Sequence, residues 1–178
     1  MIIDTILILP AIGFFILLIG DVLQLRTRSR GVFTIVIVGY IVIFFSLVFL
    51  VITAGTPTVS PIGLGIAAIA AAPATFLLWR SLFAEVTQSG GLSGDRYAVS
   101  QGTYSICRHP GFLWLTWLLV ILALVYRTPR VTMVVASMTA MNLALVAIED
   151  VFIFPRIFVN YDEYKKHVAF LLPFRKGA

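Results

Sequence analysis

Residues 32–54 read VFTIVIVGYIVIFFSLVFLVITA and contain no charged side chain. A helix needs roughly 20 apolar residues to cross the hydrocarbon core of a bilayer, so this stretch is long enough by itself. It ends in a segment rich in Gly, Thr and Pro, from Gly55 to Pro61, which is typical of a loop. The segment therefore predicts a transmembrane helix.

Four further apolar runs flank this segment. The first, from Thr5 to Leu23, is interrupted only by Asp21 and is followed by three arginines. A secretory signal has its basic residues before the apolar core, so the reverse order favours an uncleaved helix. The other three runs cover residues 62–83, 110–126 and 131–154.

Apolar residues make up 60% of the 178 residues, and charged residues make up 12%. Soluble domains average roughly 45–50% apolar and about 25% charged residues. We therefore expect an all-α integral membrane protein with about five transmembrane helices, a C-terminal helical hairpin and a short interfacial amphipathic helix. The length leaves no room for a separate soluble domain.

The expected organisation is a single membrane domain over residues 1–178. Residues 1–83 form three transmembrane helices, and residues 84–109 form a cytoplasmic loop. Residues 110–155 form the helical hairpin, and residues 156–178 form an interfacial tail. Apolar side chains in this tail recur at spacings of 4, 3 and 4 residues, which predicts a helix in the plane of the interface. They are Ile157, Tyr161, Tyr164 and Val168.

The basic residues predict the orientation, because Lys and Arg gather on the cytoplasmic side. If the loop after the first helix is cytoplasmic, eleven of the 13 basic residues fall on that side and only Arg127 and Arg130 on the other. The eleven are Arg26, Arg28, Arg30, Arg80, Arg96, Arg108, Arg156, Lys165, Lys166, Arg175 and Lys176. We expect an outside N-terminus and a cytoplasmic C-terminus, in a prokaryotic plasma membrane. The net charge of +5 then reflects lipid contact, and nucleic-acid binding is not expected.

Two polar clusters stand out against the apolar background. Residues 104–110 read YSICRHP, and Glu149 and Asp150 lie near the end of the fifth run. A hairpin folded at Pro129 places His109, twenty residues before it, level with Glu149, twenty residues after it. Arg108 falls beside Asp150 in the same way. We therefore expect both clusters at one depth, on the cytoplasmic side.

The acidic pair is costly in this position. Carboxylates near a membrane core are disfavoured by a few kcal/mol, and the end of a helix dipole repels negative charge. Arg108, Arg156 or a cationic ligand can compensate for that cost. A structural ion pair that fastens the two helices is one interpretation, and a functional site is the other. With only two histidines and the single Cys107, no metal site is expected.

The two clusters together resemble the isoprenylcysteine carboxyl methyltransferases and the related phospholipid N-methyltransferases. The resemblance covers residues 99–173, and Phe112, Trp114, Asp150 and Phe158 depart from the usual residues. The matching elements are Gly102-Thr103-Tyr104, Arg108-His109-Pro110-Gly111-Phe112, Glu149-Asp150, Ile157-Phe158, Tyr161, Tyr164 and Pro173. The first three apolar runs match only in being apolar.

The resemblance implies that the clusters bind S-adenosylmethionine and transfer its methyl group to a lipophilic acceptor. Arg108, His109 and Glu149 are the expected catalytic residues. The expected cofactor-binding residues are Tyr104, Arg108, His109, Pro110, Glu149, Asp150, Tyr161 and Tyr164. Arg108 suits the cofactor's carboxylate and Glu149 its ammonium, while the tyrosines offer aromatic faces. The two C-terminal tyrosines are equally compatible with membrane anchors and with a lid over the cofactor.

The acceptor is expected to be a prenylcysteine-type carboxylate, on a small molecule or a protein, with a phospholipid or lipid amine as the alternative. An amine acceptor must lose a proton, for which His109 or Glu149 is available. A non-catalytic scaffold or assembly protein that keeps the hairpin is a second class. A small transporter is a third, although no polar stripe or inverted repeat is visible in the first three runs. Membrane lipids are expected partners, and the oligomeric state is left open.

Overall fold

The structure, a computed structural model, describes residues 2–27, 29–85 and 95–172. Several residues used in the sequence analysis lie outside these ranges: Arg28, Pro173, Arg175 and Lys176. The same holds for residues 86–94, which belong to the expected cytoplasmic loop. Within the described ranges the chain is helical and contains no strand, apart from one isolated bridge between Arg96 and Phe158. This confirms the expected all-α class.

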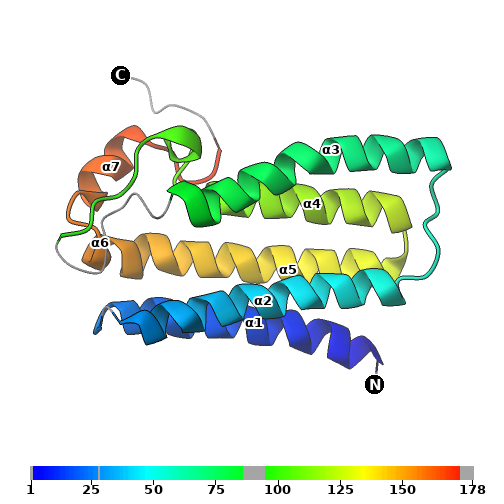
Figure 1. The fold of residues 1–178 in the computed structure, drawn as a ribbon, viewed down its shortest axis with the longest axis horizontal. Coiled ribbons are helices and arrows are strands. Elements are labelled where there is room, and N and C mark those ends of the chain that lie inside the picture. Colours follow the sequence, from blue (N-terminus) through cyan, green and yellow to red (C-terminus); the bar gives the residue numbers. More distant parts are fainter. Residues whose placement is uncertain (1, 28, 86–94, 173–178) are drawn as a thin grey trace.

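Five long helices run side by side along the molecule (Figure 1). They are α1 (Ile2–Gln24), α2 (Arg30–Thr53), α3 (Pro61–Trp79), α4 (Pro110–Tyr126) and α5 (Pro129–Ile148). Short helical segments extend them: η1 (Arg80–Glu85) after α3, η3 (Gly102–Ser105) before α4, and η4 (Glu149–Ile153), α6 (Phe154–Ile157) and α7 (Tyr161–His167) after α5.

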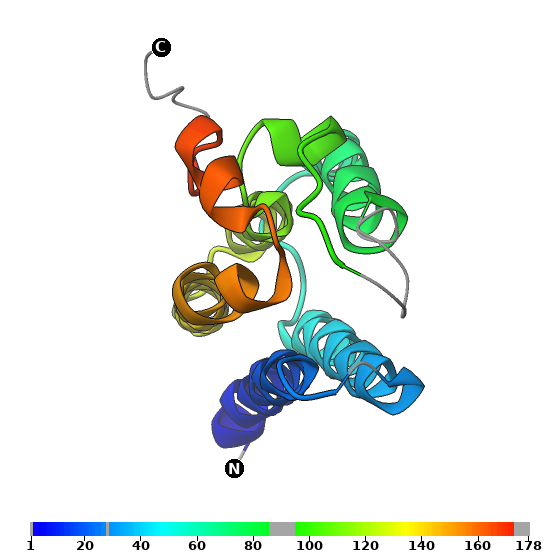
Figure 2. The same cartoon turned by 90° about the vertical axis from the view of Figure 1, so that its left-hand side faces the viewer.

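Four of these helical stretches are long and apolar enough to cross a membrane. They cover residues 6–24, 30–53, 61–84 and 129–157. The remaining helix, α4, is an apolar helix of 17 residues and lies alongside α3 and α5 (Figure 2). Large apolar side chains also point outward from α2 and α3, where Phe45, Ile62 and Ile69 are more than 60% exposed. A surface of this kind suits lipid rather than water, so the chain is a multi-pass membrane protein.

Local sequence fixes where the helices begin. Ser29, Ser60 and Thr128 each accept a hydrogen bond from a backbone N–H three residues later, at 3.2–3.3 Å. Pro61 and Pro129 each occupy the first helical position after such a cap, where a missing N–H costs nothing. Between α4 and α5 only Arg127 and Thr128 remain, and Arg127 adopts a left-handed conformation with φ 48°. This short turn makes α4 and α5 antiparallel neighbours.

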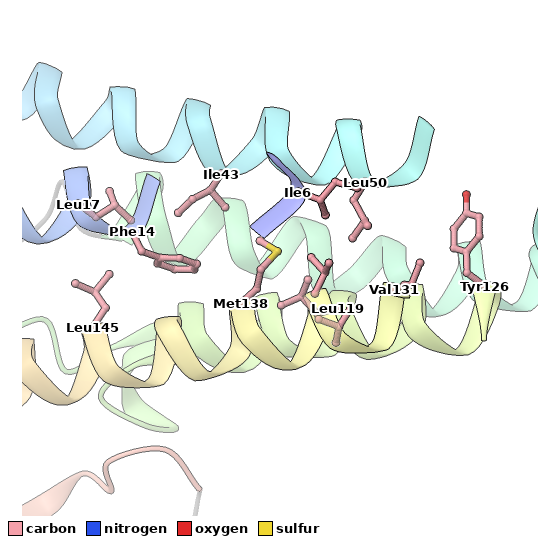
Figure 3. Packing of buried hydrophobic residues seen from close by; sticks show 12 residues of the cluster. Ile6, Phe14, Leu17, Ile43, Leu50, Leu119, Tyr126, Val131, Met138 and Leu145 are labelled. Carbon is pink, nitrogen blue, oxygen red and sulfur yellow. The ribbon is translucent and has the colours of Figure 1, made fainter. Parts of the chain in front are cut away.

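The connections alternate between the two ends of the bundle (Figure 1). The α1–α2 turn, the segment before α4 and the tail lie at one end, which we call the tail end. Seen from that end, α1 and α2 form a pair below α5, and α3 and α4 lie above (Figure 2). Buried side chains of α1, α2, α4 and α5 meet in the middle, among them Phe14, Leu50, Leu119 and Met138 (Figure 3).

The tail differs from the single amphipathic helix that its spacing predicted. The helix ends at Ile157, Phe158 is extended, and a new helix begins at Tyr161. The extended residues at this interruption pair with the segment before η3, because the Val159 N–H donates to the Arg96 carbonyl at 2.9 Å. The chain turns there, so the apolar face of α7 packs against the protein: Tyr161 and Tyr164 are buried.

Three glycines let α1 and α2 approach closely. A Cβ at Gly39 of α2 would lie 2.7 Å from Cδ2 and 3.1 Å from the backbone nitrogen of Leu17 in α1. On α1, a Cβ at Gly13 would lie 2.7 Å from Ile43, and one at Gly20 would lie 2.6 Å from Val36. Small residues are a common means of close helix packing in membranes. The contact places α1 against both α2 and α5.

We expect Gly39→Ala to destabilise the protein by about 1–3 kcal/mol, because the added methyl group overpacks the α1–α2 contact. The control is Gly65→Ala in α3, where a Cβ meets no atom within 4 Å. That variant should be neutral or stabilising, since alanine favours a helix over glycine by about 1 kcal/mol. Thermal unfolding in detergent measures both, and equal midpoints for the two variants would contradict the close contact.

Candidate functional site

The segment before α4 is held in place at the tail end. Thr103 and Cys107 are buried, and the Arg108 N–H donates to the Ala169 carbonyl at 2.9 Å. Burial raises the pKa of the Cys107 thiol, which favours its neutral form. Pro110 is fully buried at the first position of α4. Arg108 and His109 therefore enter the bundle from a fixed backbone.

The acidic pair lies where the α-helix widens into a π-helical turn. Segment η4 begins at Glu149, directly after the last residue of α5. Such turns are rare and occur often at functional sites. Both side chains are mostly buried, with 14% of Glu149 and 8% of Asp150 exposed. Both reach the same imidazole ring, so the turn brings two consecutive carboxylates to one site.

The His109 ring bridges the two carboxylates. Its Nδ1 lies 3.5 Å from Oε2 of Glu149, and its Nε2 lies 3.4 Å from Oδ1 of Asp150. Arg108 Nη1 lies 2.8 Å and 2.9 Å from the two carboxylate oxygens of Asp150. The hairpin thus has the register expected from the sequence, with His109 level with Glu149 and Arg108 beside Asp150.

Asp150 gathers further partners from the tail. The Tyr161 hydroxyl donates to its Oδ1 at 2.7 Å, and the Lys165 ammonium lies 3.9 Å from its Oδ2. A buried carboxylate needs such partners, because removing one charge of a buried pair leaves the other uncompensated. Burial and the bond to Asp150 raise the pKa of Tyr161, so its phenol remains a donor at neutral pH.

The charge state of His109 follows from its surroundings. Burial disfavours the imidazolium, but the hydrogen bonds to Asp150 and Glu149 outweigh burial and raise the pKa of His109 above its ordinary value. In the imidazolium both ring nitrogens are donors, which matches a carboxylate on each side. Each ring nitrogen of His109 therefore faces one of the two carboxylates.

Aromatic rings enclose the charged groups. The Phe154 ring stacks on His109 with centroids 5.5 Å apart, and the Phe170 ring meets it edge-on at 5.3 Å. The Arg108 guanidinium lies 5.6 Å from the centroid of Phe170. Phe158, one of the departures from the resemblance, stacks on Tyr161 at 6.1 Å. These rings lower the local dielectric and so strengthen the ionic contacts.

Tyr104 and Tyr164 join the tail to the end of α3. The Tyr164 hydroxyl donates to the Tyr104 carbonyl at 2.7 Å, and the Tyr104 hydroxyl donates to the Ser81 carbonyl at 3.1 Å. Burial raises the pKa of Tyr164, which keeps this donor protonated. The hydroxyls of Tyr161 and Tyr164 both bond inside the protein, and both residues are buried.

The structure therefore brings all eight expected cofactor-binding residues to one place. Sequence reasoning missed the side chains that surround them, namely Phe154, Phe170, Lys165, Asp21 and Gln24. Of these, only Asp21 carried a signal, as the one charge in the first apolar run. Trp114 begins the second turn of α4, and its indole nitrogen is buried without a hydrogen-bond partner in the described structure. Among the described residues, no group of three or more His, Cys, Asp or Glu side chains is arranged to hold a metal ion.

Five apolar helices with a buried ionic cluster at one end define a multi-pass membrane protein. Residues 61–151, just over half of the chain, match the model of the isoprenylcysteine carboxyl methyltransferase family. The chain belongs to this family and is a membrane methyltransferase. No curated protein and no solved structure matches it.

The family match differs in extent from the resemblance seen in the sequence. It begins at Pro61, so α3 belongs to it, although α3 had been expected to match only in being apolar. It ends at Val151 and includes Arg108, His109 and the acidic pair. Helices α1 and α2 and the tail tyrosines lie outside it.

The raised pKa of His109 gives a pH dependence of defined sign. A group whose pKa is higher in the folded protein stabilises it fully below its unfolded value, about 6.5, and loses that contribution as pH rises through the folded value. We expect the unfolding midpoint to fall as the pH is raised through the folded pKa of His109. His109→Asn should remove this part of the profile. His167→Asn, at an exposed site, should keep it, and identical profiles for wild type and His109→Asn would contradict the bridge.

Tyr161→Phe should destabilise the protein by about 1.5–3 kcal/mol, the usual worth of a hydrogen bond to a charged group. It removes the 2.7 Å bond to Asp150 and leaves the ring in place. Tyr97→Phe is the matched control, because Tyr97 is 54% exposed. Chemical denaturation in detergent measures both. A loss no larger than that of Tyr97→Phe would show that the bond adds little to stability.

Proposed function

We propose that the protein binds S-adenosylmethionine at the tail end and transfers its methyl group to a lipophilic acceptor. The observation that carries the proposal is the buried cluster of Arg108, His109, Glu149 and Asp150, which sets a guanidinium and two carboxylates side by side. S-adenosylmethionine carries a carboxylate, an ammonium and a sulfonium, so the cluster offers a complement to each charge.

The Arg108 guanidinium has an N–H donor available for a ligand. Its Nη1 is engaged by Asp150, but its buried Nε has no hydrogen-bond partner among the described residues. A buried donor without a partner costs about 1–3 kcal/mol, and a bound carboxylate removes that cost. Arg108 is therefore the residue that we assign to the cofactor's carboxylate. Its guanidinium stays oriented because Asp150 and Phe170 hold it from two sides.

Glu149 is the carboxylate that we assign to the cationic part of the cofactor. Unlike Asp150, it is not paired with Arg108, and its contact with His109 is long, at 3.5 Å. It can accept a hydrogen bond from the ammonium and favour the nearby sulfonium. Tyr104, Tyr161, Tyr164 and Pro110 complete the walls of the proposed site.

When bound, S-adenosylmethionine supplies an electrophilic methyl group whose bonding electrons leave with the sulfur. The protein's part is positioning and the exclusion of water. A carboxylate acceptor attacks without losing a proton, so no general base is needed. Because both nitrogens of His109 are engaged, we favour a prenylcysteine-type carboxylate and methyl transfer to oxygen. A lipid amine, which must release a proton to Glu149, is the alternative.

A groove between α3 and α4 supports a lipophilic acceptor. It has a volume of about 310 Å³ and is lined mainly by small and apolar side chains, including Gly63, Ala67, Val120 and Leu124. Trp117 lies at its end nearer the site, eight residues after His109, or roughly 12 Å along the helix. We assign this groove to the hydrocarbon chain of the acceptor. By the excess of basic residues at the tail end, we place the site on the cytoplasmic face.

A structural clasp is the second candidate function. The observation that favours it is the complete pairing of Asp150 with Arg108, Tyr161 and Lys165. A clasp without catalysis needs no ligand. Exchange of the pair in Arg108→Asp/Asp150→Arg should then restore the stability that either single change removes.

The deciding measurement is calorimetric titration of S-adenosylmethionine into the detergent-purified protein. We expect micromolar binding by the wild type, a loss of at least about tenfold in Glu149→Gln, and no change in the exposed control Asp162→Asn. Each variant is checked for an unchanged unfolding midpoint. A folded, monodisperse wild type that does not bind S-adenosylmethionine would exclude the methyltransferase site and leave the clasp.

A further inference from the structure

Helix α1 brings a third carboxyl group to the site. The register between α1 and α5 is visible one turn earlier, where Leu17 faces Leu145 across the core (Figure 3). Four residues later in each helix stand Asp21 and Glu149. Helix α1 contacts η4, the segment that begins at Glu149, and the two carboxyl groups are close enough to interact directly. Residues 1–60, which include α1, are outside the region that matches the family.

Two carboxyl groups can hydrogen-bond to one another only if one of them holds a proton. An ionised carboxylate is an acceptor with no hydrogen to donate, and two like charges at this distance repel. The repulsion is strong here because Asp21 and Glu149 lie in apolar helices with little water. The contact therefore requires one proton between the two groups.

Neighbouring side chains hold Asp21 in place. The Gln24 amide donates to Oδ1 of Asp21 at 3.2 Å, and Arg96 Nη1 donates to Oε1 of Gln24 at 2.8 Å. Gln24 also lies on α1, one turn after Asp21, and Arg96 comes from the segment before α4. Together these bonds fix the Asp21 carboxyl beside Glu149.

The other polar groups around the pair come from several elements. Tyr40 of α2 lies close enough to both carboxyl groups to interact with them electrostatically, and Tyr104 of η3 is a neighbour of Tyr40. His109 contacts Glu149 through one ring nitrogen and Asp150 through the other, and Asp150 in turn pairs with Arg108. If one proton is shared by Asp21 and Glu149, these two groups and Asp150 carry two negative charges together. The charges face Arg108, Lys165 and the His109 ring, so each carboxylate has a cationic neighbour.

We propose that Asp21 is a positioning residue of the methyl-transfer site, which shares one proton with Glu149 and so fixes that carboxyl group beside His109. The inference rests on the proposed function, since it assigns Asp21 to the residue that would meet the cofactor's cationic part. Asp21 itself does not touch the reacting atoms. It makes α1, a helix beyond the family match, part of the site.

The test compares two substitutions of Asp21 by calorimetric titration of S-adenosylmethionine. Asp21→Asn keeps a donor toward Glu149 and an acceptor toward Gln24, so its Kd should stay within about threefold of wild type. Asp21→Leu removes both, and its Kd should rise at least about tenfold, or about 1.4 kcal/mol. Equal affinity of Asp21→Leu and wild type would overturn the proposal, as would an Asn variant as weak as the Leu variant.

Infrared spectroscopy of the cofactor-free protein tests the shared proton directly. The C=O stretching band of a protonated carboxyl group should be present in the wild type and in the control Asp162→Asn. It should be absent from Asp21→Asn and from Glu149→Gln, in which the remaining carboxyl group can ionise. A band that persists in Asp21→Asn, or a wild type without one, would overturn the proposal even if Asp21→Leu fails to fold.

The two readouts separate this inference from the proposed function. A wild type that does not bind S-adenosylmethionine refutes the function, whatever the infrared spectra show. A wild type that binds, with Asp21→Leu binding equally well, refutes only the role of Asp21.

Discussion

The burial of two carboxylates at the end of a membrane helix is the constraint on which the tail end of this protein depends. Glu149 and Asp150 follow an apolar helix, where unpaired charge is costly and the helix dipole adds to the cost. Arg108 and the His109 imidazolium supply the compensating charge, and Tyr161 supplies a donor. The need for these partners draws the start of α4 and the tail onto the end of α5. The same carboxylates and guanidinium would complement the sulfonium, the ammonium and the carboxylate of S-adenosylmethionine.

The α4–α5 hairpin places the compensating cations at the depth of the two carboxylates. A two-residue turn capped by Thr128 fixes the register of α4 against α5, and the fully buried Pro110 fixes the start of α4. The π-helical turn then directs two consecutive carboxylates to one histidine ring. Because Phe154 and Phe170 exclude water from that ring, its ionic contacts keep their strength. Stability and proposed chemistry thus depend on the same few groups.

The half of the chain outside the family match also contributes to the site. Glycines at the α1–α2 contact allow these two helices to pack closely. Of the two, α1 is the one that packs against α5. This packing brings Asp21 close to Glu149. A carboxyl group in this place can share a proton with Glu149 and hold it beside His109 without contacting a bound ligand, which is the role that we propose for Asp21.

The apolar helices, the α4–α5 register and the grouping of Arg108 and His109 with the acidic pair could all be predicted from the sequence. These features follow from local rules: the length of an apolar run, the rise of a helix and equal spacing from one turn. The break of the tail at Phe158, the burial of Tyr161 and Tyr164 and the approach of Asp21 to Glu149 could not, and they are known from the folded structure alone. Each of these depends on contacts between segments far apart in the chain, such as Val159 with Arg96. No periodicity within one segment encodes them, because the partner's position is set by the packing of whole helices.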